Sequence, residues 1–193
     1  MQRRTTEEKI DVWILLERIK RGDREAFTEL VRLHQKRIFL LAFSFFHNRE
    51  DAMDIVQETF LRFYQKIHSF QKGKNFQSWI LQIAKNLCID HYRKNHSQRK
   101  EWRSDKNIEE MNLPSQDNHD SNRASDLKAI FSRCLENLAE RQRMVFVLKH
   151  YNQLKYKEIA EVLNISQGTV KSLHFKAVRN LRDLVNPYLG GVQ

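Results

Sequence analysis

The chain has 193 residues, enough for one domain or two small ones. Its five Gly and two Pro are too few for a turn-rich all-β sandwich or barrel. Against 24 Asp and Glu it has 34 Lys and Arg, a net charge of +10 that indicates a polyanionic partner, nucleic acid first of all. No apolar run approaches the ~20 residues needed to span a bilayer, and the polar N-terminus is not typical of a secretory signal.

The two cysteines, Cys88 and Cys134, are far apart and match no metal-ligand spacing. We therefore expect reduced thiols in a cytoplasmic protein, with no disulfide, no metal and no cofactor. The absence of a long apolar run also leads us to expect no membrane insertion.

Charge divides the chain into three parts. Residues 1–100 carry 20 cationic and 12 acidic side chains, net +8, and residues 126–193 carry 11 and 6, net +5. Between them, residues 101–125 carry 3 and 6, net −3, and are rich in Asn, Asp and Ser without helical periodicity. Such a segment buries too little apolar surface to offset its ordering entropy. The sequence therefore predicts two basic domains joined by a flexible acidic linker.

The first basic domain is predicted to be helical. A helix is expected over residues 6–21, and Asp23 is a plausible N-cap for a second helix with apolar residues at three- and four-residue steps. Asn48 is placed to cap a third helix. A fourth helix begins near Phe76, and Trp79 lies in phase with its apolar stripe, which favours a core position over a DNA-melting role. Three or four such stripes can enclose one core.

Two surfaces of this domain are candidates for binding. The third helix has an acidic face with an amide group, formed by Asp54, Gln57 and Glu58, in an otherwise basic domain. Such a face is typical of a protein-docking surface, and equally of a helix face exposed to solvent. At the end of the fourth helix, cations alternate with aromatic residues in the run DHYRKNHSQRK, which suits single-stranded DNA. The preceding loop, residues 68–75, has groups able to cradle an extruded base. The alternative is a solvated helix end whose cations complement the helix dipole.

The second basic domain carries the strongest motif. Helices are predicted over residues 126–135, 139–151 and 156–163, then a turn at 164–166 and a longer helix from 167 to about 185. The last two helices and their turn form a helix-turn-helix. In that turn Asn164 tolerates a positive φ and Ser166 can cap the following helix. The side chains expected to project outward, toward bases and phosphates, are Gln167, Thr169, Lys171, Ser172, His174 and Lys176.

These motifs together resemble a known family. NREDAMDIVQETFLRFYQKIHSF resembles regions 2.1–2.2 of bacterial sigma factors, and FQSWILQIAKNLCIDHYRKN resembles regions 2.3–2.4 of their extracytoplasmic-function (ECF) group. LENLAERQRMVFVLKHYNQLKYKEIAEVLNISQGTVKS resembles region 4. The three blocks occur in the family's order and span nearly the whole chain. The resemblance implies an all-α fold with a sigma domain 2 at residues 1–100, a linker at 101–125 and a sigma domain 4 at 126–193.

The resemblance also implies roles for individual residues. The positions where the family grips the β′ coiled coil of core RNA polymerase are Asp54, Gln57, Glu58 and Arg62. Those that melt and read the −10 element are Ser69, Phe70, Lys72, Lys74, Asn75, Asp90, Arg93 and Lys94. The positions where the family binds the −35 duplex are Arg141, Arg143 and the six outward residues of the last helix. The sequence departs from the family pattern at Leu173, where the family commonly has Arg. The promoter sequence therefore cannot be inferred from those of relatives.

The implied function is promoter-specific initiation of transcription. The implied partners are core RNA polymerase, through its β′ coiled coil and β flap, promoter DNA and an anti-sigma factor. One alternative is a one-component helix-turn-helix regulator whose N-terminal domain senses a ligand or dimerises. An enzyme such as a helical nuclease is a third class, but we find no convergent carboxylates, no Ser/His/Asp or Cys/His set and no phosphate-cradling Gly loop, and we expect no catalytic residue.

Overall fold

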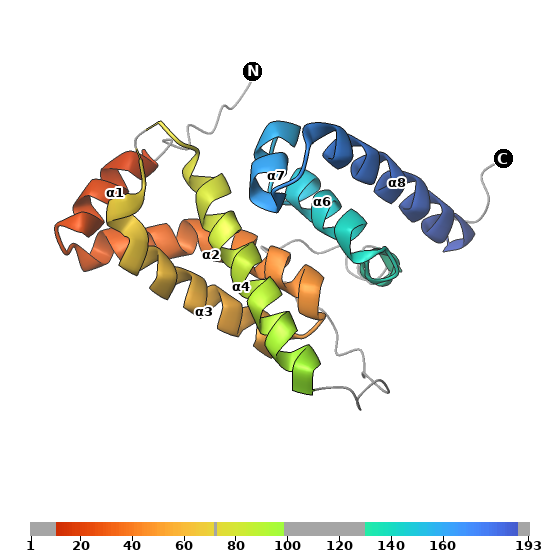
Figure 1. Cartoon of the computed structure of the whole chain (residues 1–193), viewed down its shortest axis with the longest axis horizontal. Helices are drawn as coiled ribbons and strands as arrows, with labels where there is room; N and C mark the ends of the chain where they lie inside the picture. The colour runs from red at the N-terminus through yellow and green to blue at the C-terminus, as the bar shows by residue number, and fades with distance from the viewer. Residues whose placement is uncertain (1–10, 72, 99–129, 189–193) are drawn as a thin grey trace, which may run out of the picture.

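The computed structural model describes residues 11–71, 73–98 and 130–188, and these ranges contain helices and no strand. Figure 1 shows the helices of the first domain beside those of the second. The predicted all-α fold class is therefore confirmed. The predicted linker at 101–125 and the side chain of Lys72 lie outside the described residues.

The elements of the predicted first domain are α1 (Val12–Lys20), α2 (Arg24–Phe46), α3 (Arg49–Lys66), the 3-10 helix η1 (Ile67–Ser69) and α4 (Phe76–Gln98). Of these, α2, α3 and α4 begin close to where the sequence predicts. The Asp23 carboxylate accepts the backbone N–H groups of residues 25 and 26 at 3.0 and 3.1 Å, and the Asn48 side chain caps α3 in the same way. Local capping chemistry therefore sets these helix starts.

Aromatic side chains fill the centre of the first domain. Phe63 is fully buried, and its ring meets those of Phe27, Phe76 and Trp79 with centroids 6.2, 5.7 and 6.1 Å apart. Trp79 also lies 4.9 Å from the ring of Phe70. Trp79 is half-buried and packs against the core cluster, on the face that the sequence predicts. These contacts join α2, α3 and α4 and hold the loop that precedes α4 against the domain.

The second domain contains a helical segment at residues 130–136 and three labelled helices. These are α6 (Glu140–His150), α7 (Tyr156–Leu163) and α8 (Gln167–Val185), followed by the 3-10 helix η2 (Asn186–Tyr188). The bounds of α7 and α8 match the predicted ones. Pro187 lies just beyond α8, where it cannot interrupt the helix.

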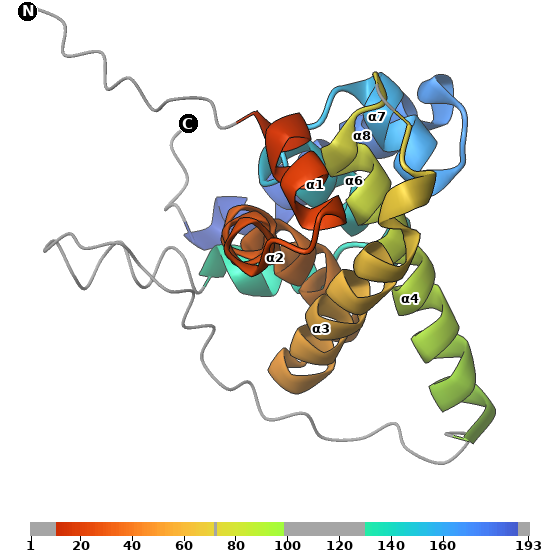
Figure 2. The ribbon, with the colours of Figure 1, turned by 90° about the vertical axis from the view of Figure 1, so that its left-hand side faces the viewer.

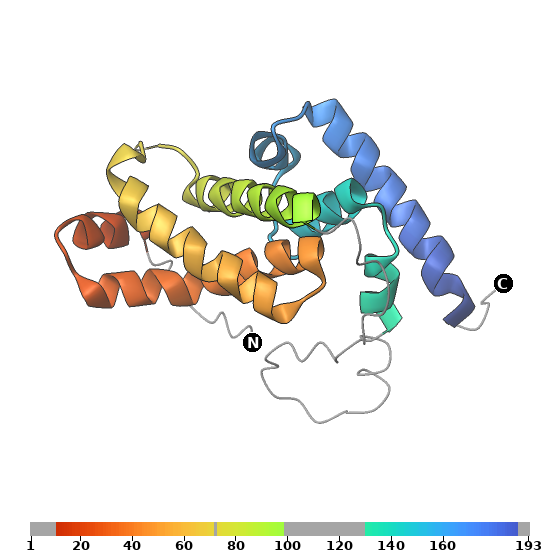
Figure 3. The ribbon, with the colours of Figure 1, turned by 60° about the horizontal axis from the view of Figure 1, so that its bottom comes forward.

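The two predicted domains pack directly against each other. Helix α7 lies on α4 and helix α6 lies on α2, as Figures 1 and 3 show. One apolar core continues across the contact, because Leu148 and Ile159 of the second domain belong to the same buried cluster as Leu81 of the first. The C-terminal half of α4 extends away from this contact (Figure 2). The shared core therefore fixes the position of the second domain relative to the first.

Candidate nucleic-acid interface

The helix-turn-helix has the local geometry that the sequence predicts. Asn164 adopts the left-handed conformation with φ of 54°, which ends α7 and turns the chain. The Ser166 hydroxyl accepts the N–H of Thr169 at 3.0 Å and so caps α8. Fully buried Ile159 and Val170 pack the two helices together. Because the start of α8 is capped and exposed, its N-terminal N–H groups are oriented for an anion such as a phosphate.

Most of the predicted −35 residues on α8 are exposed. They are Gln167, Thr169, Lys171, Ser172 and Lys176. Sequence reasoning did not include Phe175 among the DNA-binding residues, although this residue is 68% exposed and lies one turn beyond Lys171 and Ser172. The signal for it was available, since Phe175 falls outside the apolar stripe of α8. The exposed surface of α8 therefore combines hydroxyl, amide, cationic and aromatic groups.

His174 differs from its neighbours because it is half-buried and bonded within the domain. Its Nε2 lies 2.8 Å from Nε2 of His150 at the end of α6. Its Nδ1 lies 3.1 Å from the hydroxyl of Tyr156 at the start of α7. In this arrangement both ring nitrogens have partners inside the protein, so the predicted base contact of His174 would have to displace one of them.

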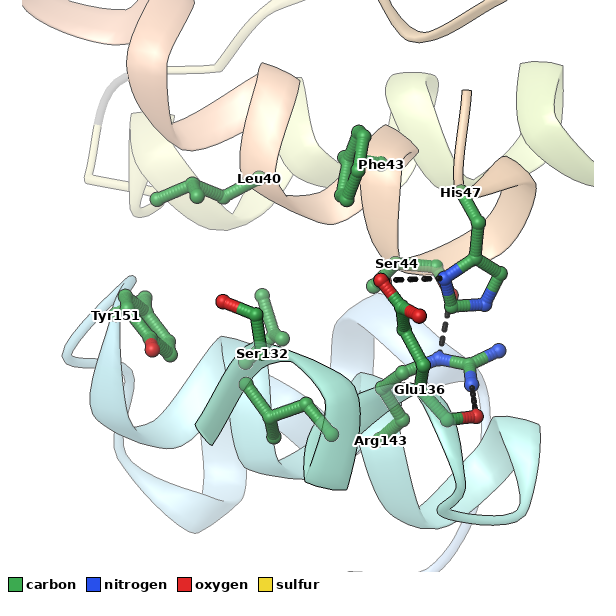
Figure 4. Close-up of a pocket in the computed structure, with 10 residues that line it drawn as sticks. Leu40, Phe43, Ser44, His47, Ser132, Glu136, Arg143 and Tyr151 are labelled. Carbon is green, nitrogen blue, oxygen red and sulfur yellow. Dashed lines mark hydrogen bonds and ion pairs between the residues drawn. The ribbon is translucent and has the colours of Figure 1, made fainter. Parts of the chain in front are cut away.

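The two arginines predicted to meet the −35 duplex lie in different environments. Arg141 is exposed, whereas Arg143 is only 7% exposed and lies between the domains. Its Nε donates to the backbone carbonyl of Ser44 on α2 at 2.7 Å (Figure 4). Its Nη1 donates to the carbonyls of Glu136 and Leu138 at 2.7 and 3.2 Å. In this arrangement the guanidinium joins the domains and does not face solvent.

Burial also affects the charge of Arg143. It lowers the pKa of the guanidinium, and the carboxylates of Glu140 and Glu136 oppose that effect. The site borders a small cavity of about 40 Å³ lined mainly by α2, the helical segment 130–136 and α6 (Figure 4). Three backbone carbonyls accept hydrogen bonds from the guanidinium, and the two carboxylates act on its charge through space. Arg143 is thus bound through peptide groups of both domains.

The predicted −10 loop is partly structural. Phe70 is buried, with its ring 5.6 Å from that of Phe76, and the Ser69 hydroxyl donates to the carbonyl of Lys66 at 2.7 Å. Lys74 is exposed at the tip of the loop beside Gly73. Gly73 has φ of 90°, a conformation that side chains rarely adopt. Phe70 therefore supports the loop, and Lys74 presents its charge to solvent.

Asn75 links the −10 loop to the other domain. Its Oδ1 accepts the N–H of Ser78 at 3.1 Å, which caps α4. Its Nδ2 donates to Oε1 of Glu158 on α7 at 2.6 Å. Close by, Nε2 of Gln77 donates to the carbonyl of Asn152 at 2.6 Å. The loop predicted for the −10 element therefore contacts the helix-turn-helix domain directly.

The polymerase candidates and part of the −10 candidates share one groove. It lies between α3 and α4, and the candidates that line it are Asp54, Gln57, Glu58, Arg62, Asp90, Arg93 and Lys94. Arg62 and Glu58 form an exposed ion pair with Nε and Oε1 2.9 Å apart. Sequence reasoning missed Leu61, which is 59% exposed in the same groove and falls out of phase with the buried face of α3. The groove thus combines an apolar side chain with charges of both signs.

Three further properties of the described residues concern thiols, metal binding and membrane spans. Cys88 and Cys134 are both buried free thiols, and burial raises the pKa of each. Across residues 11–71, 73–98 and 130–188 there is no group of three His, Cys, Asp or Glu side chains placed to hold a metal ion. Within those same ranges, every helix is too short or too polar to cross a membrane.

Comparison with known proteins identifies the class of this fold. Residues 30–98 match the family model for Sigma-70 region 2, and residues 128–181 match that for Sigma-70 region 4. The chain is 34% identical to the ECF RNA polymerase sigma factor SigW of Bacillus subtilis over 168 residues, which cover 81% of this chain and 87% of SigW. It is 29% identical over 188 residues to the ECF RNA polymerase sigma-E factor of Escherichia coli K12, with 94% and 98% covered.

A solved structure has the same fold. The sigma factor RpoE of Bartonella quintana, crystallised with the anti-sigma factor NepR, superposes with a TM-score of 0.67 at 23% identity. The match covers 83% of this chain and 96% of RpoE. The chain belongs to the ECF family of RNA polymerase sigma factors.

Proposed function

We propose that this sigma factor binds core RNA polymerase and directs it to promoters by contacting a −35 duplex with α8 and a −10 element with the loop and helix of the first domain. The observation that carries the proposal is the capped α8, which presents a row of exposed polar and cationic side chains next to a helix-turn-helix turn. An α-helix fits the major groove, where base edges differ from one another.

The exposed side chains of α8 suit distinct parts of the duplex. Lys171 and Lys176 can neutralise phosphates, and Ser172 can bond to base edges. Phe175 supplies an apolar surface, which fits the C5 methyl group of thymine. The proposed −35 element therefore contains a thymine opposite Phe175. The exposed Arg141 at the start of α6 is placed in the proposal on the phosphate backbone.

The groove between α3 and α4 is the proposed contact with the β′ coiled coil. Its exposed Leu61 offers an apolar anchor, and Asp54, Gln57 and Glu58 surround that anchor with acceptors. Apolar anchors ringed by polar groups are typical of protein interfaces. Asp90, Arg93 and Lys94 line the opposite wall on α4, where melted DNA would lie beside the polymerase. The second domain is assigned to the β flap.

The proposal requires the two domains to separate or shift on the polymerase. Asn75 is occupied by Glu158, and Arg143 by the carbonyl of Ser44, so neither is free for DNA in the packed arrangement. A ligand that binds only the open form shifts the population toward it. Core polymerase and promoter DNA together are the proposed ligands for that form.

An anti-sigma factor and a cytoplasmic location complete the proposal. Support for the anti-sigma partner comes from the structural likeness to RpoE, which was crystallised with one. Support for the location comes from the family, because a sigma factor acts where RNA polymerase and DNA are present. We infer that the protein has no enzymatic activity of its own.

The test is selection of promoters by the reconstituted holoenzyme. Core RNA polymerase with the chain is given duplexes whose upstream positions are randomised, and the transcribed templates are sequenced. We expect enrichment of two elements, at the −35 and −10 positions, and neither should be enriched by core polymerase alone. Asp90→Ala and Arg93→Ala should then reduce permanganate reactivity of the −10 region while leaving holoenzyme binding to the −35 duplex nearly unchanged. Tight binding of the chain alone to one duplex element, with no element enriched among the transcripts made by core polymerase plus the chain, would instead indicate a one-component regulator.

A further inference from the structure

Three helices of the second domain meet at one imidazole ring, that of His174 on α8. The ring of His150 from α6 stacks beside it with centroids 5.1 Å apart and planes inclined by 21°. The ring of Tyr156 from α7 lies edge-on at 5.5 Å. Both nitrogens of His174 are within hydrogen-bond distance of these neighbours, at 2.8 Å to His150 Nε2 and 3.1 Å to the Tyr156 hydroxyl. The two rings therefore connect α8 to each of the other two helices.

The 2.8 Å contact between two Nε2 atoms requires a defined proton arrangement. A neutral imidazole has one N–H donor and one bare acceptor nitrogen. One Nε2 must therefore donate and the other accept, while the Tyr156 hydroxyl completes the chain as donor or acceptor. One extra proton on the pair still leaves an acceptor, but two protons make both Nε2 atoms donors and abolish the bond.

The surroundings of the pair favour the neutral form of both imidazoles. Burial lowers the pKa of His150, and the charge of Lys149 on α6 lowers it further. Burial also lowers the pKa of His174, with His150 and Lys149 adding to the effect. Lys149 itself lies 4.9 Å above the ring of Tyr156, the titratable group that α7 contributes, and Phe146 stacks on His150 at 4.3 Å. These groups enclose the pair on the α6 and α7 sides.

We propose that His150 and Tyr156 are positioning residues for −35 recognition, which fix α8 relative to α6 and α7 by bonding to both ring nitrogens of His174. The inference rests on the proposed function of α8. It reassigns His174 from reading a base to orienting the helix whose exposed residues, such as Lys171 and Phe175, meet the DNA. A helix held in its bound orientation loses less conformational freedom when it enters the groove.

This role makes the two histidines interdependent. Either single variant breaks the bond between His150 and His174, and His174→Ala also removes the bond to Tyr156. We therefore expect His150→Ala to weaken binding of the −35 duplex by about three- to tenfold, His174→Ala to weaken it at least as much, and the double variant to weaken it no more than His174→Ala alone. All three should keep the base preference of the wild type, because neither ring touches a base in the proposal. Binding should also weaken as the pH falls through the range in which the second imidazole becomes protonated.

The experiment measures holoenzyme binding to a labelled duplex carrying the selected −35 element, by anisotropy from pH 7.5 to 5.5. His150→Gln keeps an N–H donor that does not titrate, so it should bind within about twofold of wild type at pH 7.5 and lose less affinity at pH 5.5. Glu161→Gln, an exposed change on α7, gives the baseline pH profile. Circular dichroism confirms that each variant is folded.

Two results would overturn the inference. One is a changed base preference at a single position in His174→Ala while His150→Ala binds like wild type, which would show direct readout by His174. The other is additive loss in the double variant. Failure of the proposed function is distinguishable from both, because the wild-type holoenzyme would then enrich no −35 element at all.

Discussion

Replacing Arg143 by methionine tests whether this arginine joins the two domains. Methionine keeps much of the side-chain length but leaves the carbonyls of Ser44, Glu136 and Leu138 without their donor. A hydrogen bond to a charged group contributes about 1.5–3 kcal/mol. The cost of burying the guanidinium, seen in its lowered pKa, offsets part of three such bonds. We expect a net loss of about 3 kcal/mol in the free energy of unfolding.

That loss is large enough to measure in two ways. For a chain of this size it corresponds to a decrease in Tm of about 6–12 °C, which differential scanning calorimetry resolves. Because the bond to Ser44 crosses between the domains, small-angle X-ray scattering should also show a larger radius of gyration for the variant. Arg141→Met is the matched control, an exposed change on the same helix expected to alter stability by less than about 0.5 kcal/mol.

The two arginines also distinguish folding from DNA binding. If Arg143→Met melts and scatters like Arg141→Met, the guanidinium does not hold the domains together and the reasoning from burial is refuted. If Arg143→Met is destabilised as expected, any loss of −35 binding must be measured on the holoenzyme, where the domains are held by the polymerase. A residual loss there would show that Arg143 also contacts DNA once the domains separate.

Three further predictions concern separate parts of the molecule. His34 is 4% exposed and burial lowers its pKa to about 4, so the free energy of unfolding should fall as the pH drops below 6.5, the ordinary pKa of histidine. Urea unfolding of the wild type should show a loss of about 2 kcal/mol at pH 5. The loss should be smaller in His34→Phe and the same as in the wild type in His68→Gln, an exposed change. Replacing thymine by deoxyuridine opposite Phe175 should weaken −35 binding by wild-type holoenzyme but not by Phe175→Ala, in a binding titration; equal losses would exclude the methyl contact. Gln57→Ala with Glu58→Lys should weaken core polymerase binding in a pull-down titration without changing the helical circular dichroism, and unchanged affinity would exclude the groove as the contact.

The helices of this protein were predictable because local chemistry sets their ends. Asp23, Asn48 and Ser166 each accept backbone N–H groups two or three residues ahead, which is information contained in a short stretch of sequence. The turn at Asn164 is local in the same sense. The all-α fold and the bounds of α7 and α8 therefore follow from spacing and capping alone.

The packing between the domains was not predictable in this way. The bond from Arg143 to Ser44 joins residues 99 positions apart, and that from Asn75 to Glu158 joins residues 83 apart. Helical periodicity identifies an apolar face but not the helix that will cover it. The acidic segment between two basic parts predicts two domains, but it carries no information on whether those domains share a core.

The candidate site shows the same limit at single residues. His174 and the loop that contains Asn75 were assigned to DNA from the chemistry of their polar groups, and Arg143 from the resemblance to sigma factors. Backbone carbonyls, carboxylates and a second imidazole accept the same donors, and in the packed arrangement these are the partners of Arg143, Asn75 and His174. Side-chain chemistry alone therefore cannot separate a DNA contact from a domain contact. For Arg143 and Asn75, whose partners lie in the other domain, the free energy of domain packing opposes that of promoter binding, so variants at either residue should change both.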